Sequence, residues 1–332
     1  MAKNMWLILS FMLALILAAC SPAPQDTSLL AAPASPAATQ PARSTPSEVR
    51  TIALVMKTLT NPFFVEMEKG ARQAEKELGI QLIVKTGAQE TSVEQQITII
   101  EELINAQVDA ILIAPADSIQ LIPVLKKAQE AGIVIINVDN QLDAQASAEL
   151  GLTGVPFISV NNEQGAYLSA KHISASINAP TQAMILEGIP TAKNAQDRKA
   201  GALRAFAENP HIEVVASETA HWKIDEAYQV TEKLLGQHPD VKLVFCANDM
   251  MAFGVIQYLQ KNQIGGVQVA AYDALAEAMP MLRDGSLQAT IDQQAALQAY
   301  TAVQYAIRAL DKEPLPPITL LDVMLVTREN AR

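Results

Sequence analysis

Residues 51–78 read TIALVMKTLTNPFFVEMEKGARQAEKEL, and this stretch indicates the fold class. Its first six residues are apolar or β-branched, which is typical of a strand buried on both faces of a parallel sheet. The segment 61–78 places apolar side chains at helical spacing and is followed by Gly79, so it predicts a helix. A buried strand followed by an amphipathic helix is the opening of a βαβ unit.

The same alternation fills the rest of the chain. In the first half, strands are predicted at 81–85, 110–114 and 134–138, with helices at 93–105 and 119–131. In the second half, strands are predicted at 183–186, 213–217, 241–246, 267–272 and 288–291, with helices at 195–208, 224–236, 251–261 and 276–284. Two similar halves predict an α/β protein of two Rossmann-like lobes, each a parallel, doubly wound sheet. Ligands of such sheets bind at the carboxyl ends of the strands.

The N-terminal segment predicts export. Residues 1–20 combine Lys3 with an apolar run from Met5 to Ala19 that is short for a membrane span, which needs about 20 residues. The run ends in L-A-A-C, which resembles the lipobox of bacterial lipoproteins and would make Cys20 the lipid-carrying first residue of the mature protein. A transmembrane anchor is the alternative. Residues 21–48 are rich in Pro, Ala, Ser and Thr, so we expect a disordered tether.

Composition excludes several functions. The formal net charge of −11 offers no basic surface for a nucleic acid. No phosphate-binding glycine motif and no nucleophile motif follows a predicted strand, and the four histidines lack metal-like spacing, so we expect no enzyme, no cofactor and no metal. Cys246 lies in an apolar strand and is expected to be a buried thiol.

Polar and aromatic side chains recur where the predicted strands end. Each residue alone is commonly a helix cap or a turn, as Asn61 and Pro62 illustrate. Phe63 and Phe64 are adjacent, so we expect one to pack inward and the other to face the cleft. The candidates for a binding site are Lys57, Asn61, Phe63, Phe64, Asp139, Asn140, Arg198, Trp222, Asn248, Asp273 and Gln293.

Together these side chains suit a neutral polyhydroxyl ligand. Sugar hydroxyls donate to carboxylates such as Asp139 and Asp273, and they accept from Arg198 and from amides. The C–H faces of a sugar ring suit flat aromatic walls, which the two phenylalanines and Trp222 supply.

The order and spacing of these residues resemble a known family. The segment 51–65, with its T-L-T-N-P-F-F-V, is similar to the opening of the ribose-binding proteins of bacterial ABC importers, which have the type I periplasmic binding protein fold. The similarity continues through Asp139, Arg198, A-N-D at 247–249 and Asp273 to Gln293.

The resemblance implies two lobes joined by a three-strand hinge, one formed by 49–159 with 294–321 and the other by 160–293 with 322–332. It implies that Asn61, Phe63, Phe64, Asp139, Arg198, Asn248, Asp273 and Gln293 contact a sugar. An aromatic ring stacks in the family where this chain has Trp222. Two positions depart from the ribose-binding pattern: Asn140 replaces an arginine, and Lys57 replaces a small serine. Because arginine is a multidentate donor that asparagine cannot replace, another pentose, a hexose or a polyol is as good a candidate as ribose.

These interpretations lead to one functional expectation. The protein is expected to be a monomeric, lipid-anchored, extracytoplasmic binding protein whose lobes close on a monosaccharide or a sugar polyol. Its partners are then an ABC permease with its ATPase, and the membrane through Cys20. The alternative is a receptor of the same fold that presents a sugar or quorum signal to a chemoreceptor or sensor kinase.

Overall fold

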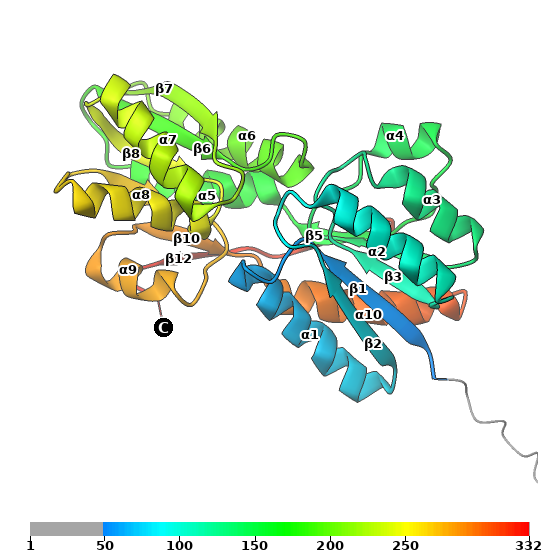
Figure 1. Cartoon of the computed structure of the whole chain (residues 1–332). Coiled ribbons are helices and arrows are strands. Elements are labelled where there is room, and N and C mark those ends of the chain that lie inside the picture. The colour runs from blue at the N-terminus through cyan, green and yellow to red at the C-terminus, as the bar shows by residue number, and fades with distance from the viewer. Residues whose placement is uncertain (1–48, 332) are drawn as a thin grey trace, which may run out of the picture. The chain divides into compact units, whose positions relative to one another are not determined.

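The computed structural model describes residues 49–331 and confirms the two-lobed α/β fold. Two six-stranded sheets lie side by side with helices packed around them (Figure 1). The predicted signal sequence, Cys20 and the tether 21–48 lie outside the described residues. Within the described range, no helix combines the length and the apolar character that a membrane crossing requires.

The first lobe contains the sheet with strands β1 (Thr51–Met56), β2 (Gln81–Thr86), β3 (Ala110–Ile113), β4 (Val134–Val138), β5 (Phe157–Val160) and β11 (Ile318–Leu321). Their order is β11-β5-β4-β3-β1-β2, and the neighbouring strands are parallel. The helices of this lobe are α1 (Pro62–Leu78), α2 (Val93–Asn105), α3 (Ile122–Glu130), α4 (Ala144–Glu149) and α10 (Ala295–Leu310). Alternate residues of β1 enter two cores: Ile52 and Leu54 pack with α1 and α10, and Ala53 and Val55 pack with α2 and α3.

The second lobe contains the sheet with strands β6 (Thr181–Glu187), β7 (Ile212–Thr219), β8 (Val241–Cys246), β9 (Gln268–Ala270), β10 (Ala289–Asp292) and β12 (Met324–Thr327). Their order is β12-β10-β9-β8-β6-β7, and β12 pairs antiparallel with β10. The helices are α5 (Asn162–Ser174), α6 (Lys193–Ala207), α7 (Ile224–Gln237), α8 (Asp249–Lys261) and α9 (Ala278–Asp284).

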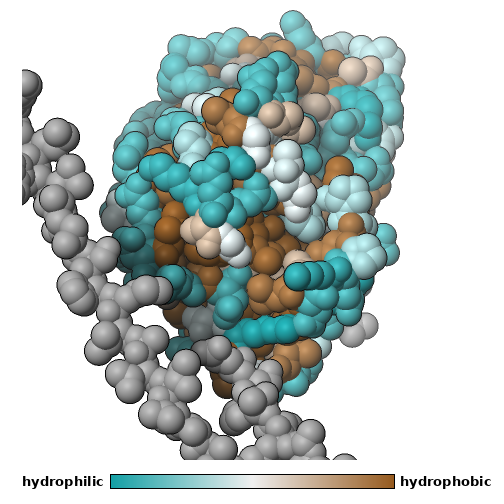
Figure 2. All heavy atoms as spheres, turned by 90° about the vertical axis from the view of Figure 1, so that its right-hand side faces the viewer, coloured by the Kyte–Doolittle hydropathy of each residue, from teal (hydrophilic) through white to brown (hydrophobic). Residues whose placement is uncertain are grey.

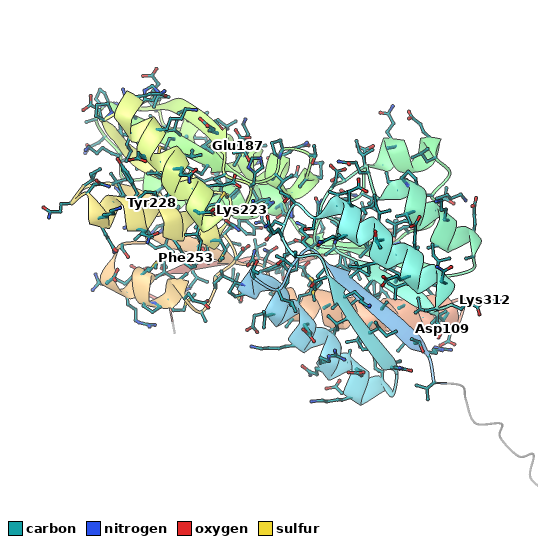
Figure 3. All side chains as sticks on the ribbon, in the orientation of Figure 1. Asp109, Glu187, Lys223, Tyr228, Phe253 and Lys312 are labelled. Carbon is teal, nitrogen blue, oxygen red and sulfur yellow. The ribbon has the colours of Figure 1, made fainter. Side chains whose placement is uncertain are left out.

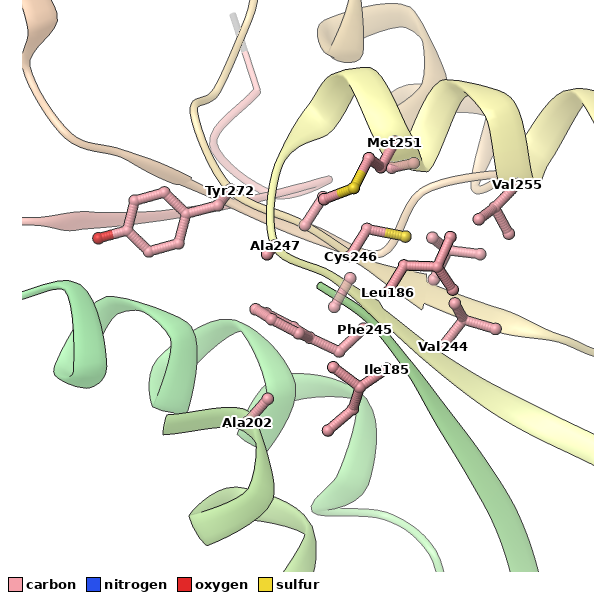
Figure 4. Close-up of a cluster of buried hydrophobic side chains, with 14 of the residues drawn as sticks. Ile185, Leu186, Ala202, Val244, Phe245, Cys246, Ala247, Met251, Val255 and Tyr272 are labelled. Atoms are coloured by element: carbon pink, nitrogen blue, oxygen red, sulfur yellow. The ribbon is translucent and has the colours of Figure 1, made fainter. Parts of the chain in front are cut away.

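The structure confirms the prediction that Cys246 is buried, in the core of the second lobe. It lies at the end of β8, fully buried and unpaired, on the side of the sheet where Figure 4 shows Met251 and Val255 of α8. Burial raises the pKa of its thiol well above the usual value, so the thiol stays protonated and unreactive.

The boundaries of α1 follow from local sequence chemistry. Asn61 precedes it, and the Asn61 side chain accepts a hydrogen bond from the Phe63 N–H, as expected of an N-cap. The helix ends at Gly79, whose φ of 66° is the left-handed conformation that glycine adopts without strain. The predicted helix 119–131 is shorter than expected, because Asp117 accepts hydrogen bonds from the N–H groups of Ile119 and Gln120 and forms a turn before α3 begins.

Helix α5 was not predicted from the sequence. Its buried face consists mainly of small and polar residues such as Gly165 and Ser169, with Ile173 as its large apolar side chain. Small residues allow close approach on both helices. A Cβ at Gly165 of α5 would lie 2.5 Å from the Tyr272 hydroxyl, and one at Gly201 of α6 would lie 2.0 Å from the carbonyl oxygen of Glu163 in α5. Close α5–α6 packing therefore uses small side chains that a search for hydrophobic periodicity overlooks.

Within residues 49–331 the chain passes three times between the sheets. It leaves the first sheet after β5, returns from β10 into α10, and leaves again from β11 into β12 (Figure 1). The first lobe is thus completed only by segments from the C-terminal part of the chain.

The ends of the first sheet differ in character. At the amino end, Asp109 accepts a hydrogen bond of 2.6 Å from the Thr51 N–H, and Figure 3 shows Asp109 there with Lys312. Figure 2 turns the corresponding side of the molecule toward the viewer and shows hydrophobic surface surrounded by hydrophilic side chains. The carboxyl ends of the same strands face the second lobe and carry the residues described next.

Candidate binding site between the lobes

A pocket lies between the lobes at the carboxyl ends of the strands. The space between the protein atoms there, open solvent included, is about 240 Å³. Its lining consists of Lys57, Asn61, Phe63, Phe64, Glu90, Asp139, Asn194, Arg198, Trp222, Asn248, Asp273 and Gln293.

The structure brings together all of the predicted ligand-binding residues except Asn140. Glu90 and Asn194 also line the pocket and were not predicted. Both lie close to the carboxyl end of a strand, Glu90 after β2 and Asn194 after β6. Examining every strand end in the sequence, and not only those with several polar residues, would have found them.

The aromatic wall of the first lobe is formed by Phe63 and Phe64. Their ring centroids lie 5.0 Å apart at an interplanar angle of 77°, an edge-to-face arrangement. Both rings line the pocket and both belong to the core that packs on α1. The expectation that only one of them would face the cleft is therefore wrong: at the first turn of α1 both rings reach the boundary between core and pocket.

Asn61 has two roles at this wall. Its Oδ1 caps α1, and its Nδ2 donates a 2.8 Å hydrogen bond to Oε1 of Glu90. Glu90 is buried, and burial raises the pKa of its carboxyl, while the charge of Lys57 acts in the opposite direction. Glu90 thus determines how the Asn61 amide is presented to the pocket.

A buried ion pair crosses the floor of the first lobe. The Lys57 Nζ lies 3.3 Å from Oδ2 of Asp139, and the two side chains are 3% and 2% exposed. The Lys57 ammonium also lies 5.7 Å from the ring centroid of Phe64 and 5.9 Å from that of Trp222, within cation–π range. Asp139 adopts a φ of 64°, a conformation that aspartate tolerates better than most residues.

Arg198, on α6, makes hydrogen bonds to several segments of the second lobe. Its guanidinium donates to Oδ1 of Asn162 at 2.8 Å, to the carbonyl oxygen of Ala247 at 2.9 Å and to Oε1 of Gln293 at 3.2 Å. It also stacks 3.8 Å from the ring centroid of Tyr272. With the contact from Nη1 to Asp273, these bonds occupy four of the five N–H groups, so one N–H on Nη2 remains for a ligand.

Asp273 is the main acceptor of the second lobe. Its Oδ1 accepts from Nε2 of Gln293 at 2.6 Å and lies 3.4 Å from Nη1 of Arg198. Burial raises the pKa of Asp273 to about 7; the charge of Arg198 opposes this rise, and that of Asp139 adds to it. The carboxyl therefore changes its protonation near neutral pH.

Trp222 and Asn248 form a side wall. Trp222 has a φ of 68°, and its ring lies over Gly188, where an added Cβ would be 2.0 Å from the indole. The indole N–H is buried and has no hydrogen-bond partner in the described part of the chain. Asn248 caps α8 by accepting from the Met251 N–H at 2.9 Å, and its Nδ2 donates to the carbonyl oxygen of Trp222 at 3.5 Å.

Asn140 does not line the pocket. Its Nδ2 donates to the carbonyl oxygen of Pro115 at 3.1 Å and to Oγ of Ser118 at 3.3 Å, and its Oδ1 accepts from the Asn194 N–H at 3.2 Å. Ser118 also accepts from the Lys193 N–H at 3.0 Å. Where the ribose-binding pattern has an arginine, this chain has a residue that joins the two lobes directly.

The site offers binding without reaction chemistry. His221 pairs with Glu226 at 2.6 Å and lies outside the pocket lining. Among residues 49–331, no group of His, Cys, Asp or Glu side chains is arranged to hold a metal ion. Hydrogen-bonding side chains and aromatic walls between two doubly wound lobes define a two-lobed ligand-binding protein.

Comparison with known proteins identifies the family of this chain. The chain belongs to the periplasmic binding protein domain family, whose model matches residues 52–314. It is 39% identical over 269 residues to the D-ribose/D-allose-binding protein of Pseudomonas aeruginosa, covering 80% of this chain and 83% of the relative. It is 31% identical to the D-allose-binding periplasmic protein of Escherichia coli, covering 83% and 91%.

A solved structure gives the same result. An ABC transporter periplasmic solute-binding protein from Actinobacillus succinogenes with bound D-allose matches with a TM-score of 0.80 and 39% identity, covering 85% of this chain and 99% of the other. The resemblance to ribose-binding proteins is thereby confirmed. These relatives are binding proteins, in agreement with the expectation that the chain is not an enzyme.

Proposed function

We propose that this protein is the sugar-binding component of an ABC importer and that it binds an aldose of the D-allose or D-ribose type. The observation that carries the proposal is the pocket, in which carboxylates, amides, one guanidinium and aromatic rings from both lobes surround a small space. The names of the relatives at 39% and 31% identity support the choice of these two sugars.

The charges of the pocket favour a neutral ligand. Lys57 is paired with Asp139, and Arg198 is paired with Asp273. The remaining charged residue is Glu90, whose raised pKa favours its neutral form. A charged ligand such as a sugar acid or an amino sugar would disturb pairs that are already balanced, whereas hydroxyls add hydrogen bonds to them.

Uptake is proposed to proceed by closure of the lobes 49–159 with 294–321 and 160–293 with 322–332. The hinge then consists of the three segments that pass between the sheets. A sugar that bonds Asp139 on one lobe and Asp273 on the other stabilises the closed state, because only that state makes both sets of bonds. The closed surface is what a permease, with its ATPase, recognises. We propose that the protein does this as a monomer.

Lipid anchoring at Cys20 is part of the proposal. The apolar run and the L-A-A-C sequence at its end support it, and they favour a location of the folded lobes outside the cytoplasmic membrane. Cys20→Ser is expected to release the protein from the membrane fraction and to abolish incorporation of labelled fatty acid. A Cys246→Ser variant is the control and should remain anchored. If Cys20→Ser stays in the membrane fraction and still incorporates labelled fatty acid, the proposed anchor is wrong.

A thermal-shift screen tests the ligand. The purified protein is heated with D-allose, D-ribose, other pentoses and hexoses, pentitols and inositols. A ligand that binds only the native state adds about 2.7 kcal/mol at a hundredfold excess over its Kd, which raises Tm by several degrees. We expect this shift with D-allose or D-ribose. The absence of a shift with every sugar would contradict the proposed function.

A further inference from the structure

Asn194 occupies a special place in the pocket. It lies in the first turn of α6, in the second lobe, and is 3% exposed. Yet its hydrogen bonds run to the first lobe: its backbone N–H donates to Oδ1 of Asn140 at 3.2 Å, and its Nδ2 donates to Oδ1 of Asp139 at 3.4 Å. The first lobe therefore holds both the backbone and the side chain of Asn194.

The orientation of the Asn194 amide follows from its neighbour. Asp139 is paired with Lys57, and an ionised carboxylate only accepts hydrogen bonds. The Asn194 Nδ2, which donates, must therefore face Asp139. Turning the amide over would place two acceptor oxygens against each other. The Oδ1 of Asn194 is consequently fixed on the opposite side of the amide.

The Asn194 Oδ1 is buried, has no hydrogen-bond partner within residues 49–331, and belongs to a residue that lines the pocket. Buried carbonyl oxygens are nearly always paired, because an unpaired one loses its hydration without compensation. An acceptor fixed in orientation and left free beside a pocket is suited to a donor on the ligand.

We propose that Asn194 is a ligand-contacting, specificity-determining residue whose Oδ1 accepts a hydrogen bond from one hydroxyl of the bound sugar. This inference rests on the proposed function and adds a condition to it. Because Asp139 and Asn140 orient Asn194 across the lobe boundary, the acceptor is presented only when the lobes are closed. The ligand must therefore have a hydroxyl at one defined position, where a hydrogen atom or a carbonyl oxygen cannot replace it.

The test uses the tryptophan of the pocket. Trp6 and Trp222 are the two tryptophans of the chain, and Trp6 lies in the predicted signal sequence. In the chain carrying Trp6→Phe, before or after removal of that sequence, Trp222 is the single tryptophan and reports sugar binding. Kd is measured for D-allose, D-ribose and the monodeoxy derivatives of D-allose, with and without Asn194→Ala. We expect Asn194→Ala to raise the Kd of D-allose about tenfold. For one monodeoxy derivative the same substitution should leave Kd unchanged, because the bonded hydroxyl is already missing.

Gln196→Ala is the control, since this residue lies in the same helix but is exposed and outside the pocket lining. If Asn194→Ala fails to fold by circular dichroism, Asn194→Ser takes its place in the same cycle. An equal loss for D-allose and for every deoxy derivative would overturn the inference, because Asn194 would then act only through closure. Unchanged binding in Asn194→Ala would overturn it while leaving the proposed function intact. If the parent chain binds none of these sugars, both fail.

Discussion

The carboxyl of Asp273 illustrates how burial prepares a single residue for binding. Buried beside Asp139, it has a pKa of about 7 even though Arg198 lies 3.4 Å away. A carboxylate that accepts a sugar hydroxyl must be ionised to give the stronger, charge-assisted bond. Ligand binding and deprotonation of this group are therefore linked.

The first prediction concerns pH. A raised pKa means that Asp273 in the sugar-free protein is protonated below about pH 7, so binding there must release the proton. We expect the Kd for D-allose to fall as pH rises from about 5.5 to 8, by at most about tenfold per pH unit for a single proton. Isothermal titration calorimetry in buffers of different ionisation enthalpy measures both Kd and proton release.

Asp273→Asn is the matched control for this prediction. It keeps the shape of the side chain, so we expect weaker binding with a flatter pH dependence. Glu90 also has a raised pKa and lines the pocket, so any remaining dependence is assigned with Glu90→Gln. A wild-type Kd that stays constant or rises between these pH values would contradict the linkage.

The second prediction concerns Glu90. Its Oε1 accepts from Nδ2 of Asn61, and a glutamine retains an acceptor at the same position. We expect Glu90→Ala to raise Kd about tenfold, since the Nδ2 of Asn61 loses its buried acceptor and the amide is held by its Oδ1 alone. Glu90→Gln is expected to bind nearly as tightly as wild type. Sugar titrations of both variants at pH 7 check this. Equal losses in the two variants would show that the charge, and not the hydrogen bond, is what matters.

At the scale of elements, the contact between α1 and α10 shows how a late segment completes the first lobe. A Cβ on Gly70 of α1 would lie 1.9 Å from the carbonyl oxygen of Ala296, which is backbone and cannot turn aside. The two helices therefore approach closely at a glycine. Because α10 belongs to the segment after the second lobe, this contact joins distant parts of the chain.

The third prediction follows from that contact. Gly70→Ala is expected to lower the free energy of unfolding by about 1–3 kcal/mol, since the methyl group forces α1 and α10 apart. Gly236→Ala in α7 is the matched control: its added Cβ would meet nothing within 4 Å, so a gain of about 0.4–1 kcal/mol is expected. Urea unfolding of both variants measures the difference. A Gly70→Ala protein as stable as wild type would show that the helices adjust without cost.

At the scale of the whole molecule, the lobes touch directly and not only through a ligand. Ser118 of the first lobe accepts from the Lys193 N–H of the second, and its own N–H donates to the carbonyl oxygen of Thr191 at 3.3 Å. Asn140 adds its bond to Asn194. Contacts of this kind stabilise the closed state and thereby raise the fraction of molecules ready to hold a sugar.

The fourth prediction tests this bias. Ser118→Ala removes contacts at the lobe boundary without touching the pocket lining, so we expect a Kd raised several-fold and a larger radius of gyration in the absence of sugar. Small-angle X-ray scattering and sugar titration measure the two effects. Ser147→Ala, in α4 of the same lobe, is the control. A raised Kd with an unchanged radius of gyration would assign the effect to the pocket instead of to closure.

The class of fold and most residues of the pocket were predictable from the sequence alone. Buried parallel strands are apolar throughout and their helices are amphipathic, so the βα alternation is visible in one dimension. Strand ends then indicated residues such as Asn61, Arg198 and Asp273, because the carboxyl ends of a doubly wound sheet converge.

The contacts between distant segments of the chain could not be predicted in this way and became visible in the folded protein. Helix α5 was not predicted because the residues of its buried face are mainly small or polar. The first lobe also includes α10 and β11, which lie far along the chain from its other elements. Glu90 and Asn194 line the pocket although they were not predicted to, and Asn140, which was predicted to line it, lies at the lobe boundary. One cause explains all three residues. Each is positioned by a hydrogen-bond partner in another segment or on the other lobe, and the spacing of residues along the chain does not reveal how close such partners lie in space.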